Sequence, residues 1–292
     1  MRVSLGWSSR RLGRLVLSSQ SLASLTLRSA GVTMAADLST NQAPVISGSV
    51  TENLKIIHER MHQAFEGSPD IVRAVKMPRL VAVSKLKSKE LIIEAYEAGQ
   101  RCFGENYVQE LFEKSTDPDI LTQCPEISWH FIGHCQSSNV NKLLKTRNLA
   151  LMETVSTSSL ADKLQARCAK EELKLNILVQ VNTSGEDNKS GVEPGTPTLE
   201  LIQHIVDKCP NLDFKGVMTI GAFSNSITDH EKANPDFVKL KETRQKVAEV
   251  MKMSEQSLEL SMGMSHDYEE AVRIGSTNVR VGSSIFGARD KR

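Results

Sequence analysis

The segment RLVAVSK, residues 79–85, decides how the rest of the chain is interpreted. Residues 80–83 form a continuous apolar run, which is typical of a parallel strand whose two faces are both buried. A helical pattern with Ser88 as its expected N-cap follows almost at once. Lys85 therefore lies where a strand passes into a loop, at the edge where α/β proteins place their chemistry. A lysine there is more often an ordinary solvated side chain, so its role depends on the rest of the sequence.

The same unit of strand and helix recurs along the chain. Apolar segments predict strands at residues 79–85, 101–106, 128–133, 149–155, 174–182, 213–221, 257–264 and 278–287. Helical patterns lie between them at 88–98, 107–115, 137–145, 158–171, 197–208, 235–252 and 267–274, and an amphipathic helix at 50–65 precedes the first strand. Eight strands joined by helices predict a single-domain (β/α)8 TIM barrel, with the first helix filling the place behind the last strand. An open doubly wound sheet is the alternative, but no G-x-G-x-x-G motif follows the first strand.

Composition excludes several classes of protein. The chain of 292 residues is 39% hydrophobic and 24% charged, and it has no apolar run of the roughly 18–20 residues that a membrane-spanning helix needs. The net charge of +1 provides no electrostatic argument for nucleic acid binding. The five cysteines are scattered and contain no C-x-x-C pair, which indicates free thiols in a reducing compartment rather than disulfides or a zinc site.

The first 36 residues differ from the rest, because they contain five arginines and eight serines but no lysine or acidic residue. This composition is typical of a mitochondrial presequence. Met34 followed by two alanines also resembles an ordinary initiator, so residues 1–33 fit equally well an upstream extension that is seldom translated. Both interpretations stay open, and they predict a protein of the mitochondrion, the cytoplasm or both. Residues 37–49 are expected to be a linker, and residues 50–290 the barrel domain.

Residues at the carboxyl ends of barrel strands face the ligand. These ends supply one amine, one guanidinium, amides, hydroxyls and glycines: Lys85, Asn106, Gly133, His134, Asn182, Gly221, Met264, Ser265, Arg280, Gly282 and Ser283. The set has no pair of carboxylates for glycoside or aspartyl chemistry and no set of metal ligands, so neither a catalytic residue nor a metal ligand is predicted. His130 lies on a strand rather than a helix, and it is expected to be a hydrogen-bonded core residue.

The segment VRVGSSIFG, residues 279–287, is the second informative feature. Its glycines let backbone N–H groups approach an anion, and its serines add hydroxyls. Phosphate sites in barrels commonly use the loops after the seventh and eighth strands, where Ser265 and this segment lie. Alone, the segment also fits a tightly packed turn. Together with Lys85 it predicts a phosphorylated aldehyde that forms a Schiff base at one end and lies in a phosphate cradle at the other.

Seven blocks spread over residues 79–290 resemble one known family. They are RLVAVSK (79–85), FGENYVQE (103–110), WHFIGHCQSSNVNK (129–142), VNTSGE with the following KSG (181–191), MTIG (218–221), LSMGMS (260–265) and VRVGSSIFGARD (279–290). Together they resemble the pyridoxal phosphate homeostasis protein family, of the proline synthase co-transcribed homologue type. The resemblance implies a barrel similar to the N-terminal domain of alanine racemase, with pyridoxal 5′-phosphate (PLP) as the cofactor and no established catalytic activity.

The resemblance also implies which residues surround the cofactor. Lys85 matches the lysine that forms the Schiff base, and Arg280 matches the arginine that faces the pyridine nitrogen. Asn106 is expected beside the ring. The residues that match the phosphate cradle are Ser265, Gly282 and Ser283. The implied function is PLP homeostasis, in which the cofactor is held and released by a monomeric protein whose partners include PLP-dependent apo-enzymes.

An argument from charge favours a carrier over an enzyme. Arginine stays protonated at any relevant pH, so opposite the pyridine nitrogen it disfavours a second positive charge and makes the ring a weaker electron sink. Alanine racemase shares this arginine but adds a tyrosine base from a second domain or partner subunit. The three tyrosines here, Tyr96, Tyr107 and Tyr268, do not lie in such a domain. The alternatives are a low-activity amino-acid racemase or related PLP enzyme, and a scaffold that has lost its ligand.

Overall fold

Eight parallel strands pair in chain order and close into a barrel, which confirms the predicted (β/α)8 fold. The computed structural model describes residues 48–69, 72, 76–186, 189–226 and 233–287. The expected presequence at 1–36, the expected linker up to residue 47 and the end of the predicted domain at 288–290 lie outside these ranges. The strands are β1 (Arg79–Val83), β2 (Cys102–Glu105), β3 (Ser128–Phe131), β4 (Leu149–Val155), β5 (Leu175–Gln180), β6 (Leu212–Met218), β7 (Glu259–Ser261) and β8 (Asn278–Val281).

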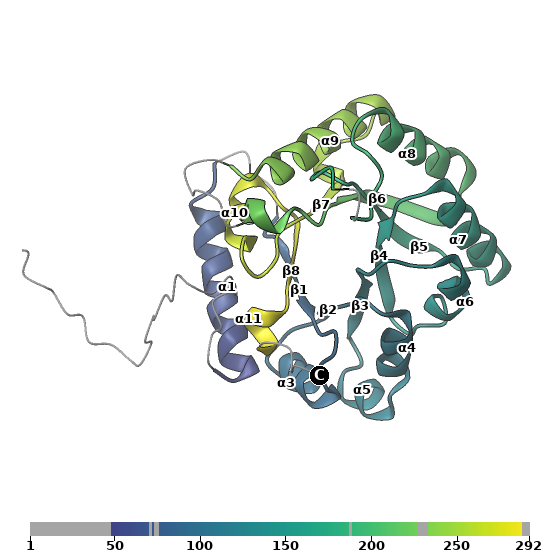
Figure 1. Ribbon diagram of the computed structural model, residues 1–292. Helices are drawn as coiled ribbons and strands as arrows, with labels where there is room; N and C mark the ends of the chain where they lie inside the picture. Colours follow the sequence, from purple (N-terminus) through teal and green to yellow (C-terminus); the bar gives the residue numbers. More distant parts are fainter. Residues whose placement is uncertain (1–47, 70–71, 73–75, 187–188, 227–232, 288–292) are drawn as a thin grey trace, which may run out of the picture. The chain divides into compact units, whose positions relative to one another are not determined.

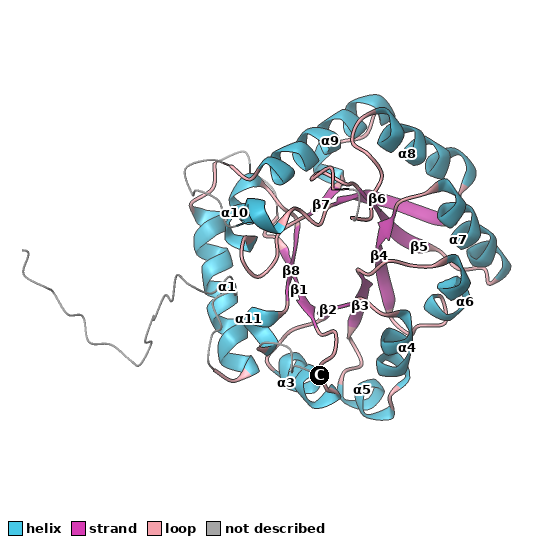
Figure 2. Ribbon diagram, in the orientation of Figure 1, coloured by secondary structure: helices cyan, strands magenta, loops and turns pink. Residues whose placement is uncertain are grey.

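Helices surround the ring of strands on the outside (Figures 1 and 2). The longer ones are α1 (Val50–Glu66), α3 (Lys89–Glu97), α4 (Val108–Thr116), α7 (Ser158–Lys170), α8 (Thr196–Lys208), α9 (Pro235–Met251) and α10 (Tyr268–Ile274). The shorter ones are α5 (Pro118–Gln123), α6 (Val140–Leu143) and α11 (Ser283–Phe286), with 3-10 turns at 137–139, 223–226 and 255–257. No helix in these parts of the chain is long and apolar enough to cross a membrane.

The segment after β8 differs from its prediction. A strand was expected through residue 287, but β8 ends at Val281 and α11 follows it. The carbonyl of Gly282 accepts hydrogen bonds from the backbone N–H groups of Ile285 and Phe286, both at 2.9 Å. These bonds turn the chain into a short helix, so the expectation of a continuous strand over 278–287 is wrong.

Helix α1 covers the part of the barrel that the short α11 leaves open, as the sequence predicts. A capping box begins the helix, because the Ser49 hydroxyl accepts from the Glu52 N–H while the Glu52 carboxylate accepts from the Ser49 N–H. Its buried face packs against α10, α11 and α3. The Asn53 side-chain amide donates to the carbonyl of Ile285 at 2.9 Å, which ties α1 to α11 directly. The first helix therefore completes the outer layer behind the last strand.

The two sides of the strand ring bury different side chains. Large apolar residues such as Phe103 and Trp129, whose ring centroids lie 5.8 Å apart, belong to the main hydrophobic core. A separate small apolar cluster contains Leu151, Leu178 and Met218. Successive side chains of a strand alternate between its two faces, so this second cluster faces the barrel interior. The interior also holds buried polar and charged side chains, among them Glu153 and Arg280.

Candidate functional site

A cavity of about 320 Å³ opens at the carboxyl ends of the strands. All six residues predicted to surround a cofactor line it: Lys85, Asn106, Ser265, Arg280, Gly282 and Ser283. Lys87 and His266 also line it, and Val83, Ile132, Ile220 and Met264 supply apolar wall. The structure therefore brings together, from β1, β2 and the ends of β7 and β8, residues that are almost 200 positions apart in the sequence.

Four other residues at strand ends do not line this cavity: Gly133, His134, Asn182 and Gly221. His134 lines a neighbouring cavity of about 340 Å³, which shares Asn106 with the first. Asn182 closes its own loop, since its amide donates to the Glu186 carbonyl and its oxygen accepts from the Gly185 N–H. The carbonyl of Gly221 accepts from Lys189. For these four residues, position at a strand end was not sufficient to predict contact with the cavity.

The backbone next to Lys85 is fixed on both sides. Lys114 of α4 donates to the Ser84 carbonyl at 2.8 Å, and the Ser84 N–H donates to the Gly104 carbonyl at 3.0 Å. After Lys85 the chain turns sharply at Leu86, whose φ of 60° is costly for a residue with a branched side chain. The Leu86 N–H donates to the Glu110 carboxylate at 2.6 Å, which holds this turn. Lys85 thus extends from a well-supported corner between β1 and α3.

Glu105 lies behind this corner, and sequence reasoning did not single it out. Its Oε1 atom accepts from the Ser84 hydroxyl and from Lys114 Nζ, both at 2.7 Å. Its Oε2 atom is buried and accepts no hydrogen bond from the described residues. Burial raises the pKa of the Glu105 carboxyl, and Lys114 and Ser84 offset that effect incompletely.

Arg280 extends from β8 into the interior of the barrel, where it is 4% exposed. Its Nη2 donates to the Thr219 carbonyl at 2.7 Å, and its Nη1 donates to the Ser261 hydroxyl. The Ser261 hydroxyl in turn donates to Glu153 Oε2 at 2.6 Å. Burial lowers the pKa of Arg280, and the nearby carboxylates of Glu153 and Asp267 act against that effect.

Glu153 is the centre of this interior network. Its Oε1 atom accepts from His130 Nδ1 at 2.7 Å and from the Asn278 amide at 2.9 Å. Although burial acts to raise it, the pKa of Glu153 is lowered to about 2 by His130, Arg280 and Ser261. The pKa of His130 is raised to about 9, because hydrogen bonds to Cys102 and Glu153 outweigh its burial. The prediction that His130 is a hydrogen-bonded core residue is confirmed, whereas Glu153, Ser261 and Asn278 were not predicted.

Gly282 and Ser265 approach each other at the edge of the cavity where β8 ends beside β1. The Gly282 N–H donates to the Ser265 hydroxyl at 3.3 Å. A Cβ atom on Gly282 would lie 3.2 Å from both Cβ and the carbonyl oxygen of Val83. A side chain at this position would therefore push against β1, so a glycine keeps the turn close to the cavity wall.

Comparisons with known proteins agree with this geometry. The family model described as "Alanine racemase, N-terminal domain" matches residues 70–290. The human pyridoxal phosphate homeostasis protein is 50% identical over 241 residues, which cover 81% of this chain and 86% of that protein. The solved structure of PipY from Synechococcus elongatus with PLP bound has a TM-score of 0.64 and 28% identity, and covers 82% of this chain and 100% of PipY. Alanine racemase from Clostridium difficile has a TM-score of 0.61 at 15% identity over 81% of this chain and 60% of its own, so it is similar in fold alone.

Proposed function

The chain belongs to the alanine racemase N-terminal domain family and, within it, to the pyridoxal phosphate homeostasis proteins, and on this premise we propose that it binds PLP in the cavity at the strand ends. The observation that carries the proposal is the meeting of Lys85, Arg280 and the turn at residues 282–283 around one cavity. PLP homeostasis, in which the protein holds the cofactor and releases it to apo-enzymes, is the function that this site supports best.

The residues present fit the cofactor. A volume of about 320 Å³ is at the lower end of the range for small-molecule sites. Apolar side chains form part of its wall, as a planar aromatic ring requires, and cationic side chains enter it from β1 and β8. The buried Oδ1 atom of Asn106 has no hydrogen-bond partner among the described residues and would accept a bond from a ring substituent. The Ser265 hydroxyl accepts from the Gly282 N–H and keeps its own proton to donate where a phosphate would lie.

Each of these residues has a definite task in the proposal. The primary amine of Lys85 joins the aldehyde carbon as a Schiff base, with loss of one water molecule. Ser265, Gly282 and Ser283 donate hydrogen bonds to the phosphate. Arg280 faces the pyridine nitrogen, and its bonds to Ser261 and the Thr219 carbonyl hold its guanidinium group in one orientation. When bound, PLP supplies an electron sink, which a facing cation weakens.

The same arrangement supports a carrier rather than a catalyst. None of the three tyrosines lines the cavity within the described ranges. The hydroxyl of Tyr96 accepts from the Glu126 N–H, and Tyr268 is buried in α10. Burial raises the pKa of Tyr268 to about 12, so this phenol is a poor proton acceptor near neutral pH. Two-base racemisation therefore has no second acid–base group from these residues.

A visible absorption spectrum of the purified protein with PLP tests the proposal. We expect a Schiff-base band that borohydride abolishes, leaving a mass increment on the peptide that contains Lys85. Lys85→Ala should lose the band, whereas the matched control Lys87→Ala, a second lysine of the same cavity, should keep it. If Lys85→Ala kept the band and Lys87→Ala lost it, the attachment site would be wrong. Exchange of the α-proton of D- or L-amino acids by the loaded protein would favour a racemase instead.

The phosphate end is tested separately. Three charge-assisted hydrogen bonds of about 1.5–3 kcal/mol each reach micromolar retention without a covalent link when they are near the upper end of that range. Lys85→Ala should therefore still bind PLP, as the free aldehyde and with faster release. Ser265→Ala combined with Ser283→Ala should keep the Schiff-base band at saturating PLP but lose much of the affinity. Equal affinity in the double variant and the wild type would exclude this phosphate cradle.

A further inference from the structure

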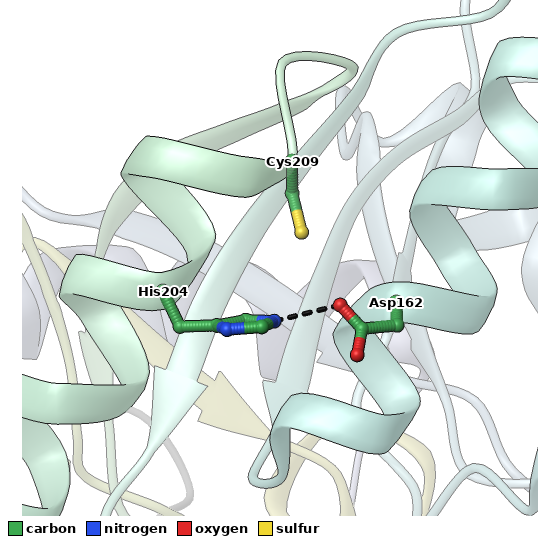
Figure 3. A group of neighbouring side chains, drawn as sticks. All are labelled: Asp162, His204 and Cys209. Carbon is green, nitrogen blue, oxygen red and sulfur yellow. Dashed lines mark hydrogen bonds and ion pairs between the residues drawn. The ribbon is translucent and has the colours of Figure 1, made fainter.

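Three side chains with different ligand atoms meet on the outer surface of the barrel (Figure 3). Asp162 lies on α7, His204 lies on α8, and Cys209 directly follows α8. One carboxylate oxygen, one imidazole nitrogen and the sulfur all lie within 4.8 Å of one another. Among the described residues, this is the one group of three or more such side chains whose ligand atoms are this close. None of the three lines the proposed PLP cavity.

The chemistry of these atoms selects a type of ion. Mg²⁺ and Ca²⁺ prefer sites made of oxygen ligands, whereas Zn²⁺ binds sulfur, nitrogen and oxygen in a tetrahedral arrangement. Bond lengths of about 2.0–2.3 Å place the ligand atoms of tetrahedral zinc roughly 3.3–3.7 Å apart. His204 Nε2 and Asp162 Oδ1 lie 2.6 Å apart, as a hydrogen-bonded pair. Small side-chain rotations would therefore convert the present arrangement into three zinc ligands.

The backbone around the three residues is already fixed. The Cys209 N–H donates to the Ile205 carbonyl and the Cys209 carbonyl accepts from the Leu212 N–H, both at 2.9 Å. Gln165 of α7 forms two hydrogen bonds with Asn211, of 2.8 and 2.9 Å, which tie α7 to the turn that carries the cysteine. The backbone that carries the ligands is therefore already ordered, so binding an ion costs little further conformational entropy.

Exposure of the cluster leaves room for a fourth ligand. The Cys209 side is closed, since this residue is 1% exposed. The Asp162 side is open, with 57% of its side chain exposed. A solvent molecule can therefore complete the coordination from outside, as it does in zinc sites with three protein ligands. Cysteine spacing does not exclude zinc here, because two of the three ligands are not cysteines and lie on α7 and α8.

Taken separately, His204 and Asp162 form an ordinary surface hydrogen bond, and Cys209 is a small buried thiol. These separate roles do not explain why the sulfur lies beside the His204–Asp162 pair. We propose that Asp162 Oδ1, His204 Nε2 and Cys209 Sγ bind one Zn²⁺ ion, with water in the fourth position. The ion links α7 to the turn between α8 and β6. This site is independent of PLP binding.

Metal-free full-length protein, titrated with Zn²⁺ alone and with Co²⁺ alone, tests the site. We expect about one equivalent of Zn²⁺ to bind per chain, and Co²⁺ to give a thiolate-to-metal charge-transfer band with the intense visible bands of four-coordinate cobalt. Cys209→Ser should lose the charge-transfer band and weaken binding by at least ~10-fold. Cys168→Ser, which removes another buried thiol from α7, is the matched control and should bind as the wild type does.

Asp162→Asn provides a variant that should fold normally, because the side chain is mostly exposed. It should weaken Zn²⁺ binding by at least ~10-fold while leaving the thiolate-to-metal charge-transfer band at saturating Co²⁺. Absence of saturable Zn²⁺ binding in the wild type would overturn the proposal. So would unchanged binding in both Cys209→Ser and Asp162→Asn, or an equal loss in Cys168→Ser. Repeating the titration with PLP-loaded protein should give the same result, so failure here and failure of the PLP proposal are distinguishable.

Discussion

Two buried glutamates lie behind two of the cations that line the cavity, Lys85 and Arg280, and their surroundings differ. Glu105 lies behind the corner that carries Lys85, and one of its oxygens accepts two hydrogen bonds while the other accepts none from the described residues. Glu153 lies beneath Arg280, and its two oxygens accept three, from His130, Asn278 and Ser261. Both side chains are fully buried, so the difference is in their partners.

The partners decide which protonation state each carboxyl favours. Burial alone raises the pKa of a carboxyl group, and it does so for Glu105 despite Lys114. For Glu153, three donors and the guanidinium of Arg280 overcome the same cost, and the pKa falls to about 2. The interior network is therefore a fixed ionic structure that orients Arg280. The cluster behind Lys85 is only partly satisfied, and it can take up a proton more easily.

Replacing each glutamate by glutamine is the strongest test of this difference. Glu153→Gln leaves Arg280 and His130 buried without their counter-charge, so the free energy of unfolding should fall by about 3–5 kcal/mol. Glu105→Gln removes a costly charge and keeps the shape, so the change should be within about 1 kcal/mol. Chemical denaturation at neutral pH measures both. Similar losses in the two variants would show that burial, and not the number of donors, governs both residues.

The sequence predicted the residues that line the cavity but not the buried residues that hold them in place. Lys85, Ser265 and Arg280 lie at or next to strand ends, where position in a barrel already predicts exposure to a ligand. Glu153 lies within the apolar segment LALMETV, where nothing marks a partner. His130 and Asn278 lie on β3 and β8, and they meet Glu153 only because the closed ring brings inward-facing positions together.

The fold was predicted more completely than the network, for a physical reason. Apolar periodicity is local, so each strand and helix is visible within its own segment. Two short elements were missed. Helix α5 has only six residues, too few for periodicity to identify. Residues 283–286 look strand-like because they follow β8 closely and contain Ile285 and Phe286, and only the turn at Gly282 makes them helical. A charged side chain on a strand gives one usable signal, since a buried charge needs a partner.

Acid titration should distinguish the two glutamates, because each changes the stability of the protein in a different pH range. The folded pKa of Glu153 is lowered from 4.5 to about 2, so its contribution to stability is present above pH 4.5 and is lost as the pH falls toward 2. Within that range the wild type should lose up to about 1.4 kcal/mol per pH unit more than Glu153→Gln. Glu105 has the opposite effect because its folded pKa is raised: its contribution to stability is present below pH 4.5 and is lost as the pH rises above that value. Parallel curves for the wild type and Glu153→Gln between pH 4.5 and 2 would contradict the ionic network.

Lys114→Met should have a smaller effect, and one that depends on pH. The substitution leaves Glu105 with the Ser84 hydroxyl alone, which should cost about 1–3 kcal/mol of unfolding free energy at neutral pH. The loss should shrink at mildly acidic pH, because a protonated Glu105 no longer needs the cation. Lys246→Met is the control, since Lys246 pairs with Glu249 at the surface and should cost at most about 0.5 kcal/mol. A loss that is the same at both pH values would mean that Lys114 acts through packing alone.

The smallest expected effects come from the serine in each cluster, and they test which cluster controls the cofactor. The Ser261 hydroxyl accepts from Arg280 and donates to Glu153, and without it Arg280 Nη1 and Glu153 Oε2 are 3.9 Å apart, too far for a hydrogen bond. Ser261→Ala should therefore lower the unfolding free energy by about 1–2 kcal/mol and, because Arg280 becomes free to reorient, also speed PLP release.

The Ser84 hydroxyl only donates to Glu105. Since Lys114 contacts the same carboxylate oxygen, Ser84→Ala should cost about 0.5–1 kcal/mol and leave PLP release unchanged. Urea unfolding measures the first quantity for both variants, and loss of bound PLP during dialysis measures the second. If Ser84→Ala released PLP faster than Ser261→Ala, the corner that carries Lys85, and not the ionic network beneath Arg280, would be the part of the barrel that retains the cofactor.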